Sequence, residues 1–558
     1  MTAVTTRTPS TVRSALLAAL ATLALALPQI GLPVLSAAPA PAPAPAPAAS
    51  VAIDPSVPDM LATTGTVEVI VQVDPFAAAR ARSAVQRSGG TVLRDLPIVQ
   101  GFEARLTPEA LQALTGTPGV RAVTLDGEVY VQSETSEDGS TTRPLDSSFV
   151  EHIGADDLHA QGYDGAGVGI ALIDTGVNPV TDLAGRVVGG IDLSGEANDV
   201  DSYGHGTFIA GIAAGDGTAS AGEHAGVAPG AHVVSVKIAG ASGSTDVSNV
   251  LAAIQWVVSF KADHDIGVLN LAIGTDSAQS YTLDPLNFAV ERAWAEGIVV
   301  VVSASNRGPE AGTISKPADD PWVITVGSVD SEGTETRTDD TLASFSGRGP
   351  TVADAVVKPD LVVPGVSLVG TRAHGSTVAE AYPVAYVGDD YMRGTGTSFS
   401  AAVVSGAVAV LRQAHPDWTP DQVKAALMGT AAPGPVGDPN ADGAGAVDLV
   451  AASALVDPAA ANQGLQRSSG TGSMAAARGS LAISVKASAT AEARVLDRSV
   501  GRTAQDDSWD SVAAEEFRTG VWSASEWYAS EWYASEWYAS EWYASEWYAS
   551  EWYASEWY

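Results

Sequence analysis

The chain has 558 residues, which is too long for one ordinary domain, so we expect two to four modules. Acidic residues outnumber basic residues 65 to 29, and the resulting net charge of −36 argues against nucleic acid or an anionic membrane surface as a partner. The chain contains no cysteine, which excludes disulfides, cysteine-ligated zinc and a thiol nucleophile. The excess of carboxylates suits a soluble exported protein and leaves groups available for structural calcium, for example in the acidic loop 196–201, where no spacing is specific for the ion.

Residues 1–48 have the features of an export signal followed by a spacer. Arg7 and Arg13 precede an uncharged apolar run over 14–27, which is shorter than the roughly 20 residues of a membrane span. The alternative is an uncleaved anchor, because no charged residue follows the apolar run until Asp54. Alternating alanine and proline over 39–47 then predict an extended spacer. We therefore expect a secreted, extracellular protein.

Residues 65–131 predict a small α+β module. The pattern indicates strand, helix, strand, strand, helix and strand, in that order, at 67–73, 76–86, 91–96, 101–106, from 107, and 120–125. Thr107 is placed as the cap of the second helix, with Pro108 at its first position. The polar, acidic stretch that follows, 132–147, is typical of an exposed loop open to proteolysis.

From 148 to 455 short apolar runs alternate with helical patterns, which predicts a parallel sheet covered by helices on both faces. The predicted strands are at 168–173, 233–238, 268–273, 298–303 and 323–326, and predicted helices include 247–260 and 286–295. Thr419 and Gln422 form the pattern of a capping box for a helix to about 430.

Two low-complexity segments follow the predicted domain. Residues 456–522 are rich in alanine, serine and glycine, and we predict a linker of low order. Residues 523–558 repeat Glu-Trp-Tyr every five residues, in seven copies. Neither a strand nor a helix gathers a five-residue repeat onto one apolar face, so a flexible tail is expected.

Three short segments carry residues suited to nucleophilic catalysis. Asp174 follows the apolar run 169–173, which places it at the carboxyl end of a strand, where ligand sites of α/β sheets lie. There a carboxylate can hold a histidine in the useful tautomer. His205, within Gly-His-Gly-Thr before a small-residue helix, is suited to be general base and then general acid. Taken alone, Asp-Thr-Gly and His-Gly-Thr are also ordinary turns.

Ser398 lies at the start of an apolar helix that runs to about 414, where backbone N–H groups favour developing negative charge. The alternative role is a helix-capping serine. Asn306 follows the buried strand at 299–303, and its amide could stabilise an oxyanion together with the Ser398 backbone N–H. Asn-Xaa-Gly is otherwise a common turn.

The order Asp, His, Ser, together with the asparagine, resembles the catalytic domain of the subtilisin-like serine proteases (subtilases, peptidase family S8). The 65–131 module resembles the inhibitor I9-type propeptide of that family. The resemblance implies an α/β, three-layer domain with about seven parallel strands, preceded by a small α+β propeptide domain. It also implies that Asp174, His205 and Ser398 form the triad, that Asn306 is the oxyanion donor, and that catalysis needs no cofactor.

The resemblance also assigns substrate-binding segments. The family's substrate backbone pairs with a strand represented here by Ala272, Ile273 and Gly274, and a second segment is represented by Ser303, Ala304 and Ser305. Ala272 stands where serine is common, and Ser305 stands where glycine is common on the wall of the primary pocket. We therefore predict reduced acceptance of large aromatic P1 side chains.

These features predict a secreted serine endopeptidase that acts on protein or peptide substrates. We expect an autoprocessed zymogen that is inhibited by its own propeptide until cleavage between about 128 and 148. The alternative is a surface-binding or scaffold protein with a vestigial protease domain, in which the aromatic tail contacts the cell surface or wall by avidity. A sedolisin-like peptidase, with a Glu-Asp-Ser set, is the nearest enzymatic alternative, and the context of His205 argues against it.

Overall fold

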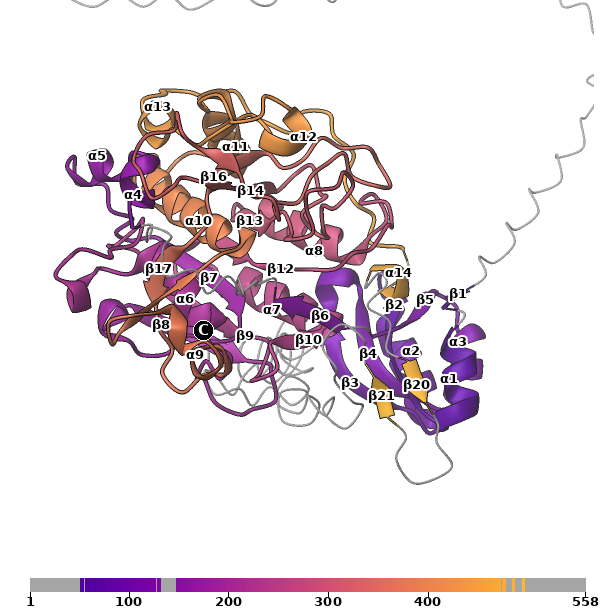
Figure 1. Ribbon diagram of the computed structural model, residues 1–558. Helices are drawn as coiled ribbons and strands as arrows, with labels where there is room; N and C mark the ends of the chain where they lie inside the picture. Colours follow the sequence, from indigo (N-terminus) through magenta and orange to yellow (C-terminus); the bar gives the residue numbers. More distant parts are fainter. Residues whose placement is uncertain are drawn as a thin grey trace, which may run out of the picture. The chain divides into compact units, whose positions relative to one another are not determined.

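The computed structural model describes residues 51–54, 56–126, 128–131, 147–472, 474–477, 484–486 and 494–496. These residues all belong to one compact unit that begins at Ser50 (Figure 1). The predicted signal and spacer, nearly all of the acidic loop, most of the predicted linker and the repeat tail lie outside the described residues. None of the described helices is long and apolar enough to cross a membrane.

Residues 51–126 form what we call the N-terminal module, a five-stranded sheet with three helices. The strand order is β1-β5-β2-β4-β3, with bounds β1 (Ala52–Ile53), β2 (Val67–Val73), β3 (Thr91–Leu96), β4 (Gly101–Leu106) and β5 (Val120–Leu125). The helices are α1 (Ser56–Thr64), α2 (Ala78–Arg87) and α3 (Pro108–Thr115), with a short 3-10 turn η1 (Pro97–Val99).

The sequence predicted β2 to β5, α2 and α3, and Thr107 caps α3 as predicted, accepting a hydrogen bond from the backbone N–H of Ala110. The structure adds β1 and α1 ahead of them. Neither gives a periodic signal, because β1 has two residues and α1 contains Pro58. β1 is nevertheless paired, in parallel with β5.

The main sheet follows the order β15-β14-β13-β11-β7-β9-β8, and β16 pairs with β14. Its strands are β7 (Gly169–Asp174), β8 (Val187–Asp192), β9 (His232–Lys237), β11 (Ile266–Leu271), β13 (Val299–Ser303), β14 (Ile324–Asp330), β15 (Thr341–Leu342) and β16 (Leu361–Pro364). All of these pairings are parallel except that of β15 with β14. Parallel strands place their carboxyl ends at one edge, and that edge carries the site described below.

Helices cover both faces of this sheet (Figure 1). On one face α6 (His205–Ala214) packs against α10 (Thr397–Ala414), and α10 also crosses β11, β13 and β14. On the other face α7 (Val247–Ser259) packs against α8 (Pro285–Ala295). The remaining helices are α4 (Phe149–His152), α5 (Ala155–His159), α9 (Thr377–Ala381), α11 (Pro420–Gly429), α12 (Pro439–Asp442), α13 (Leu449–Ser453) and α14 (Met474–Ala477).

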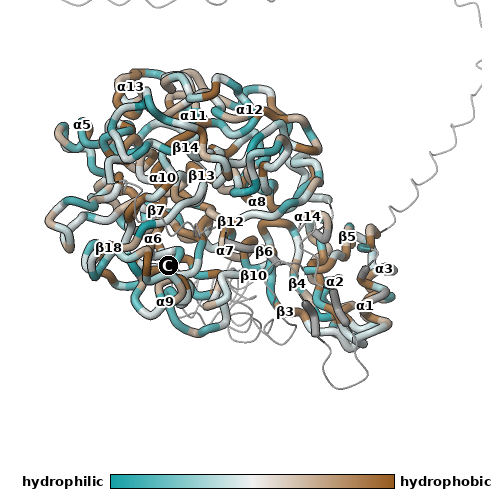
Figure 2. Tube along the Cα trace, viewed as in Figure 1, coloured by the Kyte–Doolittle hydropathy of each residue, from teal (hydrophilic) through white to brown (hydrophobic). Residues whose placement is uncertain are grey.

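The apolar core lies between these layers, and Figure 2 shows the apolar residues in brown along the sheet and α10. Every residue of β7 and of β13 is buried, as parallel strands covered on both faces require. The predicted capping box of α11 is confirmed, because Thr419 and Gln422 make both of its reciprocal hydrogen bonds.

Three smaller sheets complete the described strands. They are β10 (Ser244–Asp246) with β6 (Glu128–Val131) and β12 (Ile273–Gly274); β17 (Leu368–Thr371) with β19 (Tyr391–Gly394) and β18 (Tyr386–Val387); and β20 (Ser484–Lys486) with β21 (Arg494–Leu496). Beyond α13 the chain continues along the domain surface, and we call residues 461–472 the C-terminal strap. The strap lies within the stretch for which the sequence predicted low order.

Candidate active site

The predicted acid and base lie side by side at the carboxyl edge of the main sheet. Asp174 is the last residue of β7, and His205 is the first residue of α6. Both are buried, and the Nδ1 atom of His205 is 2.9 Å from each carboxylate oxygen of Asp174. This contact fixes the imidazole ring and leaves Nε2 as the ring nitrogen available for the predicted role of base. The Nε2 atom is buried and has no hydrogen-bond partner among the described residues.

Glycines on either side of His205 permit this approach. Gly204 has φ 109°, a left-handed conformation that favours glycine. A Cβ at Gly206 would lie 2.2 Å from the carbonyl oxygen of Gly176, in the loop that follows Asp174. The Gly-His-Gly pattern thus serves the packing of α6 against the end of β7.

A second buried carboxylate, that of Asp201, connects the two elements. It accepts hydrogen bonds from the backbone N–H of Gly204 at 2.6 Å and of Thr207 at 2.8 Å, at the start of α6. It also accepts the hydroxyl of Thr175 at 2.7 Å, and Thr175 Oγ1 accepts the N–H of Gly206 at 2.9 Å. Burial raises the pKa of Asp201, while these hydrogen bonds act to lower it.

Sequence reasoning missed this role for Asp201. It placed the residue in an acidic loop, 196–201, as a candidate calcium ligand. In the structure Asp201 faces inward and Glu196 pairs with Lys237 at 2.7 Å. In the part of the chain that the structure describes, no group of three or more acidic, histidine or cysteine side chains is arranged to hold a metal ion. The position of Asp201 four residues before His205 was the available signal.

Ser398 is the second residue of α10 and is buried. The next residue, Phe399, brings its ring to 5.6 Å from the imidazole of His205, between centroids. The α10 N-terminus therefore lies against the imidazole of His205, and the helix dipole favours negative charge at this point.

Asn306 lies three residues beyond the end of β13 and is tied to the same helix. Its Oδ1 atom accepts the backbone N–H of Thr397 at 2.9 Å and the Thr397 hydroxyl at 2.8 Å. With the oxygen oriented toward α10, the amide nitrogen is directed away from Thr397. The structure thus brings Asp174, His205, Ser398 and Asn306 to neighbouring ends of β7, α6, α10 and β13.

The two predicted substrate-binding segments also run side by side. β11 and β13 pair in parallel up to Leu271 and Val302, so Ala272 and Ser303 continue neighbouring strands at the carboxyl edge. Beyond Ala272, Ile273 and Gly274 form β12. β12 pairs antiparallel with β6, and β10 pairs with the other edge of β6. The segment after the N-terminal module, β6, therefore pairs with the predicted substrate-binding strand.

The wall segment has an unusual backbone at Ser305. Ala304 continues the sheet pattern through its N–H, 2.9 Å from the carbonyl of Val326. Ser305 has φ 116°, a conformation that favours glycine, and its side chain is buried. Its hydroxyl donates to the carbonyl of Thr313, and this bond holds the side chain in place.

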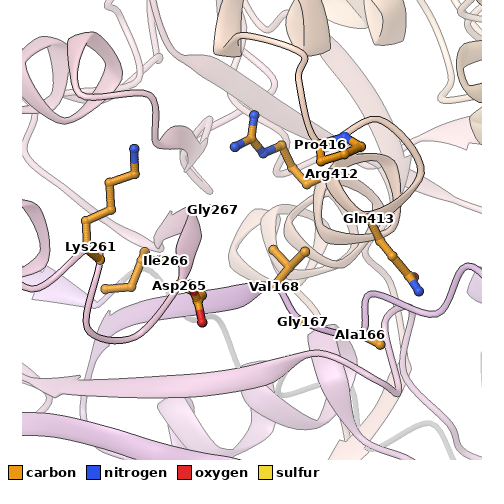
Figure 3. Close-up of a pocket in the computed structure, with 11 residues that line it drawn as sticks. Ala166, Gly167, Val168, Lys261, Asp265, Ile266, Gly267, Arg412, Gln413 and Pro416 are labelled. Carbon is orange, nitrogen blue, oxygen red and sulfur yellow. The ribbon is translucent and has the colours of Figure 1, made fainter.

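A cavity of about 380 Å³ lies at the opposite ends of the same elements (Figure 3). It is lined near the starts of β7 and β11 and near the end of α10, by residues that include Val168, Ile266 and Arg412. Asp174 and Ser398 lie at the other ends of β7 and α10. This cavity contains none of the predicted site residues.

Known proteins are similar to this chain in sequence and in fold. Serine protease AprX of Bacillus subtilis (strain 168) is 35% identical over 352 residues, which cover 62% of this chain and 77% of that protein. An alkaline protease of Alkalihalobacillus alcalophilus is 31% identical over 363 residues, covering 65% of this chain and 81% of that protein. Each is a relative in which the matched region includes most of the protein.

Among solved structures, fervidolysin from Fervidobacterium pennivorans, a keratinolytic enzyme related to subtilisin, aligns with a TM-score of 0.56 and 26% identity. The alignment covers 70% of this chain and 61% of that chain, so less than two thirds of fervidolysin is matched. The sequence profile of the subtilase family matches residues 165–509, more than half of the chain and a range that contains all four predicted catalytic residues. The chain therefore belongs to the subtilase family, peptidase family S8, of serine proteases.

Proposed function

We propose that the protein is a serine endopeptidase in which Ser398, His205 and Asp174 act as the triad. The Ser398 hydroxyl attacks the peptide carbonyl carbon, and His205 Nε2 takes the hydroxyl proton and gives it to the leaving amine. Water then hydrolyses the acyl-enzyme by the same route in reverse. The observation that carries this proposal is the 2.9 Å contact of His205 Nδ1 with both Asp174 oxygens, beside the N-terminus of α10.

The tetrahedral intermediate needs donors for its oxyanion. We assign this role to the Asn306 amide and the backbone N–H of Ser398, because Thr397 fixes the orientation of the amide. Loss of one such donor lowers kcat by about 10²–10³. The triad and these donors supply nucleophile, base and charge stabilisation, so the proposed chemistry requires no cofactor. Structural calcium remains a proposal based on composition alone.

The test of catalysis compares Ser398→Ala with a matched serine variant. Ser259→Ala changes an exposed serine at the far end of α7. We expect Ser398→Ala to abolish hydrolysis of a casein or chromogenic peptide substrate, and Ser259→Ala to leave it unchanged. Full activity of Ser398→Ala would overturn the assignment.

We also propose that the N-terminal module is a propeptide that inhibits the enzyme until it is cleaved off. Two observations support this. β6 lies between β10 and β12 as an extended substrate would. The apolar residues Ile70, Leu96 and Ile98 of the module belong to the same buried cluster as the catalytic core. Cleavage is expected in the region 128–148.

Intact mass and N-terminal sequencing of the secreted protein test this proposal. We expect the wild type to lose its first 128–148 residues and Ser398→Ala to retain them beyond the signal. A purified Ser398→Ala protein that still lost its N-terminal module would rule out self-processing. The same measurement reports whether the predicted signal is removed, on which the proposed secreted location depends.

The Glu-Trp-Tyr tail, which lies outside the described residues, has a separate proposed role. Repeated aromatic pairs can bind cell-wall glycan or a surface protein by avidity, and the tail would then retain the enzyme at the cell surface. The competing explanation is repeat expansion without a function. A chain truncated before Ser523 distinguishes them, since unchanged retention on cells would remove the anchoring role.

A further inference from the structure

The C-terminal strap packs closely on the catalytic domain. The indole Nε1 of Trp322 donates to the carbonyl of Gln466 at 3.1 Å. The guanidinium of Arg467 lies over the Trp322 ring, 3.8 Å from its centroid. The backbone N–H of Ser468 donates to Oε1 of Glu291, in α8, at 2.8 Å. These contacts hold the first part of the strap along α8.

The second part of the strap follows the loop that leads into α8. Backbone N–H groups of Ser469 and Gly472 donate to the carbonyls of Thr282 and Leu283 at 2.8 and 2.7 Å. Gly470 is buried, and a Cβ there would lie 2.8 Å from Cγ of Phe288. The strap is therefore fixed by backbone hydrogen bonds and close packing, together with side-chain hydrogen bonds from Asn462 and Ser468.

The N-terminal module contacts the strap at this buried point. Gln72 of β2 is fully buried and donates its side-chain amide N–H to the carbonyl of Gly470. In β2, Val71 and Val73 face the module's own core, whereas Ile70 joins the catalytic core cluster. Gln72 shares the face of Ile70, so it is part of the surface that the module presents to the catalytic domain.

The chain beyond the strap extends this contact. α14 packs against both β5 of the module and α8 of the catalytic domain. The carbonyl of Ala477 accepts the hydroxyl of Thr275, the residue that follows β12. α14 therefore lies between the module and the predicted substrate-binding strand (Figure 1).

We propose that residues 461–472 and 474–477 form a docking surface for the N-terminal module, in addition to α7 and α8, which contact η1 of the module, and that they slow its dissociation after cleavage. The inference rests on the proposed role of the module as a cleavable inhibitor. The buried amide of Gln72 is the specific contact, because separation of the module leaves the Gly470 carbonyl without it. The C-terminal strap and α14 thereby set how long the cleaved enzyme remains inhibited.

Two changes test this proposal, a pair of C-terminal truncations and a substitution in the full chain. The first compares chains that end at residue 460 and at residue 480, which differ in the strap and α14. The second is Gln72→Glu, which keeps the side chain's shape but sets a carboxylate against the Gly470 carbonyl. Its matched control is Gln112→Glu, at an exposed glutamine of α3. Intact mass follows cleavage, and the lag before peptide hydrolysis follows dissociation of the cleaved module.

We expect normal cleavage in all four proteins, and dissociation about 10-fold faster or more without the strap and in Gln72→Glu, because a buried carbonyl loses its partner. In the chain ending at 460, Gln72→Glu should add no further effect. Lags within about twofold of the controls, for both changes, would overturn the proposal. If the chain ending at 460 does not fold, the proposal is decided by comparing the lag of Gln72→Glu with that of Gln112→Glu. Absence of cleavage in the wild type would instead refute the proposed zymogen.

Discussion

We expect Asp201 to position the proposed acid and base, an effect on catalysis that can be separated from folding. The Thr175 hydroxyl lies 2.7 Å from Asp201 and 3.2 Å from Asp174, so its proton goes to Asp201. In Asp201→Ala the Thr175 hydroxyl donates its hydrogen bond to the Asp174 carboxylate instead. That carboxylate then stabilises the histidine cation less, because part of its charge is engaged by the hydroxyl. We expect kcat to fall about 10-fold or more with little change in KM, because the base is less well held. The acid limb of the kcat/KM profile should move to lower pH.

Asp201→Asn is the conservative comparison, since its amide oxygen still accepts from one of the α6 N–H groups. It should recover part of kcat. A purely structural role would lower the yield of folded enzyme and leave the pH profile of the remaining activity in place, and that result would contradict the positioning role.

Ser305 provides the residue-scale prediction about specificity. Its hydroxyl is tied to Thr313, and its φ of 116° suits glycine. Ser305→Gly removes a buried hydroxymethyl group from the proposed pocket wall. We expect kcat/KM for Phe and Tyr at P1, relative to Ala, to rise about 10-fold, the usual effect of one small group in a pocket. A wild-type enzyme that already strongly prefers Phe or Tyr in a P1-varied peptide library would contradict this.

At the scale of elements, the sequence predicted those with a strong local signal. The apolar runs of β7 and β13 and the capping box of α11 could be predicted because their signals are periodic or chemical and local. The edge placement of Asp174 followed from its position after an apolar run. Its 2.9 Å contact with His205 depends on sheet topology, which no local pattern contains.

Elements held by distant partners were not predictable. The C-terminal strap has an Ala/Ser/Gly-rich neighbourhood and no period, and its order comes from α8 and Trp322. The pairing of β6 with β12 joins residues far apart in the chain. The sequence places Asp201 only in an acidic loop, because its partners Thr175 and Thr207 are identified only by folding.

The α11 capping box gives an element-scale prediction. Thr419→Ala removes the side chain that accepts the N–H of Gln422 at 3.3 Å, so one N–H at the helix start loses its partner. We expect the free energy of unfolding to fall by about 1 kcal/mol. The measurement is denaturant unfolding in the Ser398→Ala background, which prevents autolysis. Thr338→Ala, at an exposed loop threonine, should change it by less than about 0.5 kcal/mol.

At the scale of the whole molecule, the surface between the N-terminal module and α7 contains a buried charged cluster. Arg94 Nε is 2.6 Å from Oε2 of Glu103, and both side chains are fully buried. Asp126 accepts the backbone N–H of Ser248, in α7, at 3.1 Å. Burial raises the pKa of Glu103 to about 8 and that of Asp126 to about 6, against the opposing charge of Arg94; Glu68 lies close enough to raise both.

For the proposed release of the module, these pKa values predict a dependence on pH. When the module separates, both carboxyls return to water and to ordinary pKa values near 4, so docking takes up protons. The contribution to binding is complete below those ordinary values and is lost as pH rises through about 6 and about 8. Dissociation of the cleaved module should therefore be faster at about pH 8.5 than at about pH 5.5.

The lag before activity measures this release, normalised to enzyme that has already lost its module so that the pH dependence of catalysis cancels. Glu103→Gln removes one titrating group, keeps the side chain's shape, and should flatten the dependence between about pH 6.5 and 8.5, where Glu103 loses its proton. Glu109→Gln, at an exposed position of α3, is the matched control and should leave the slope unchanged. A release rate that is constant or slows with rising pH would show that the buried cluster stays ionised in the docked state, held by Arg94.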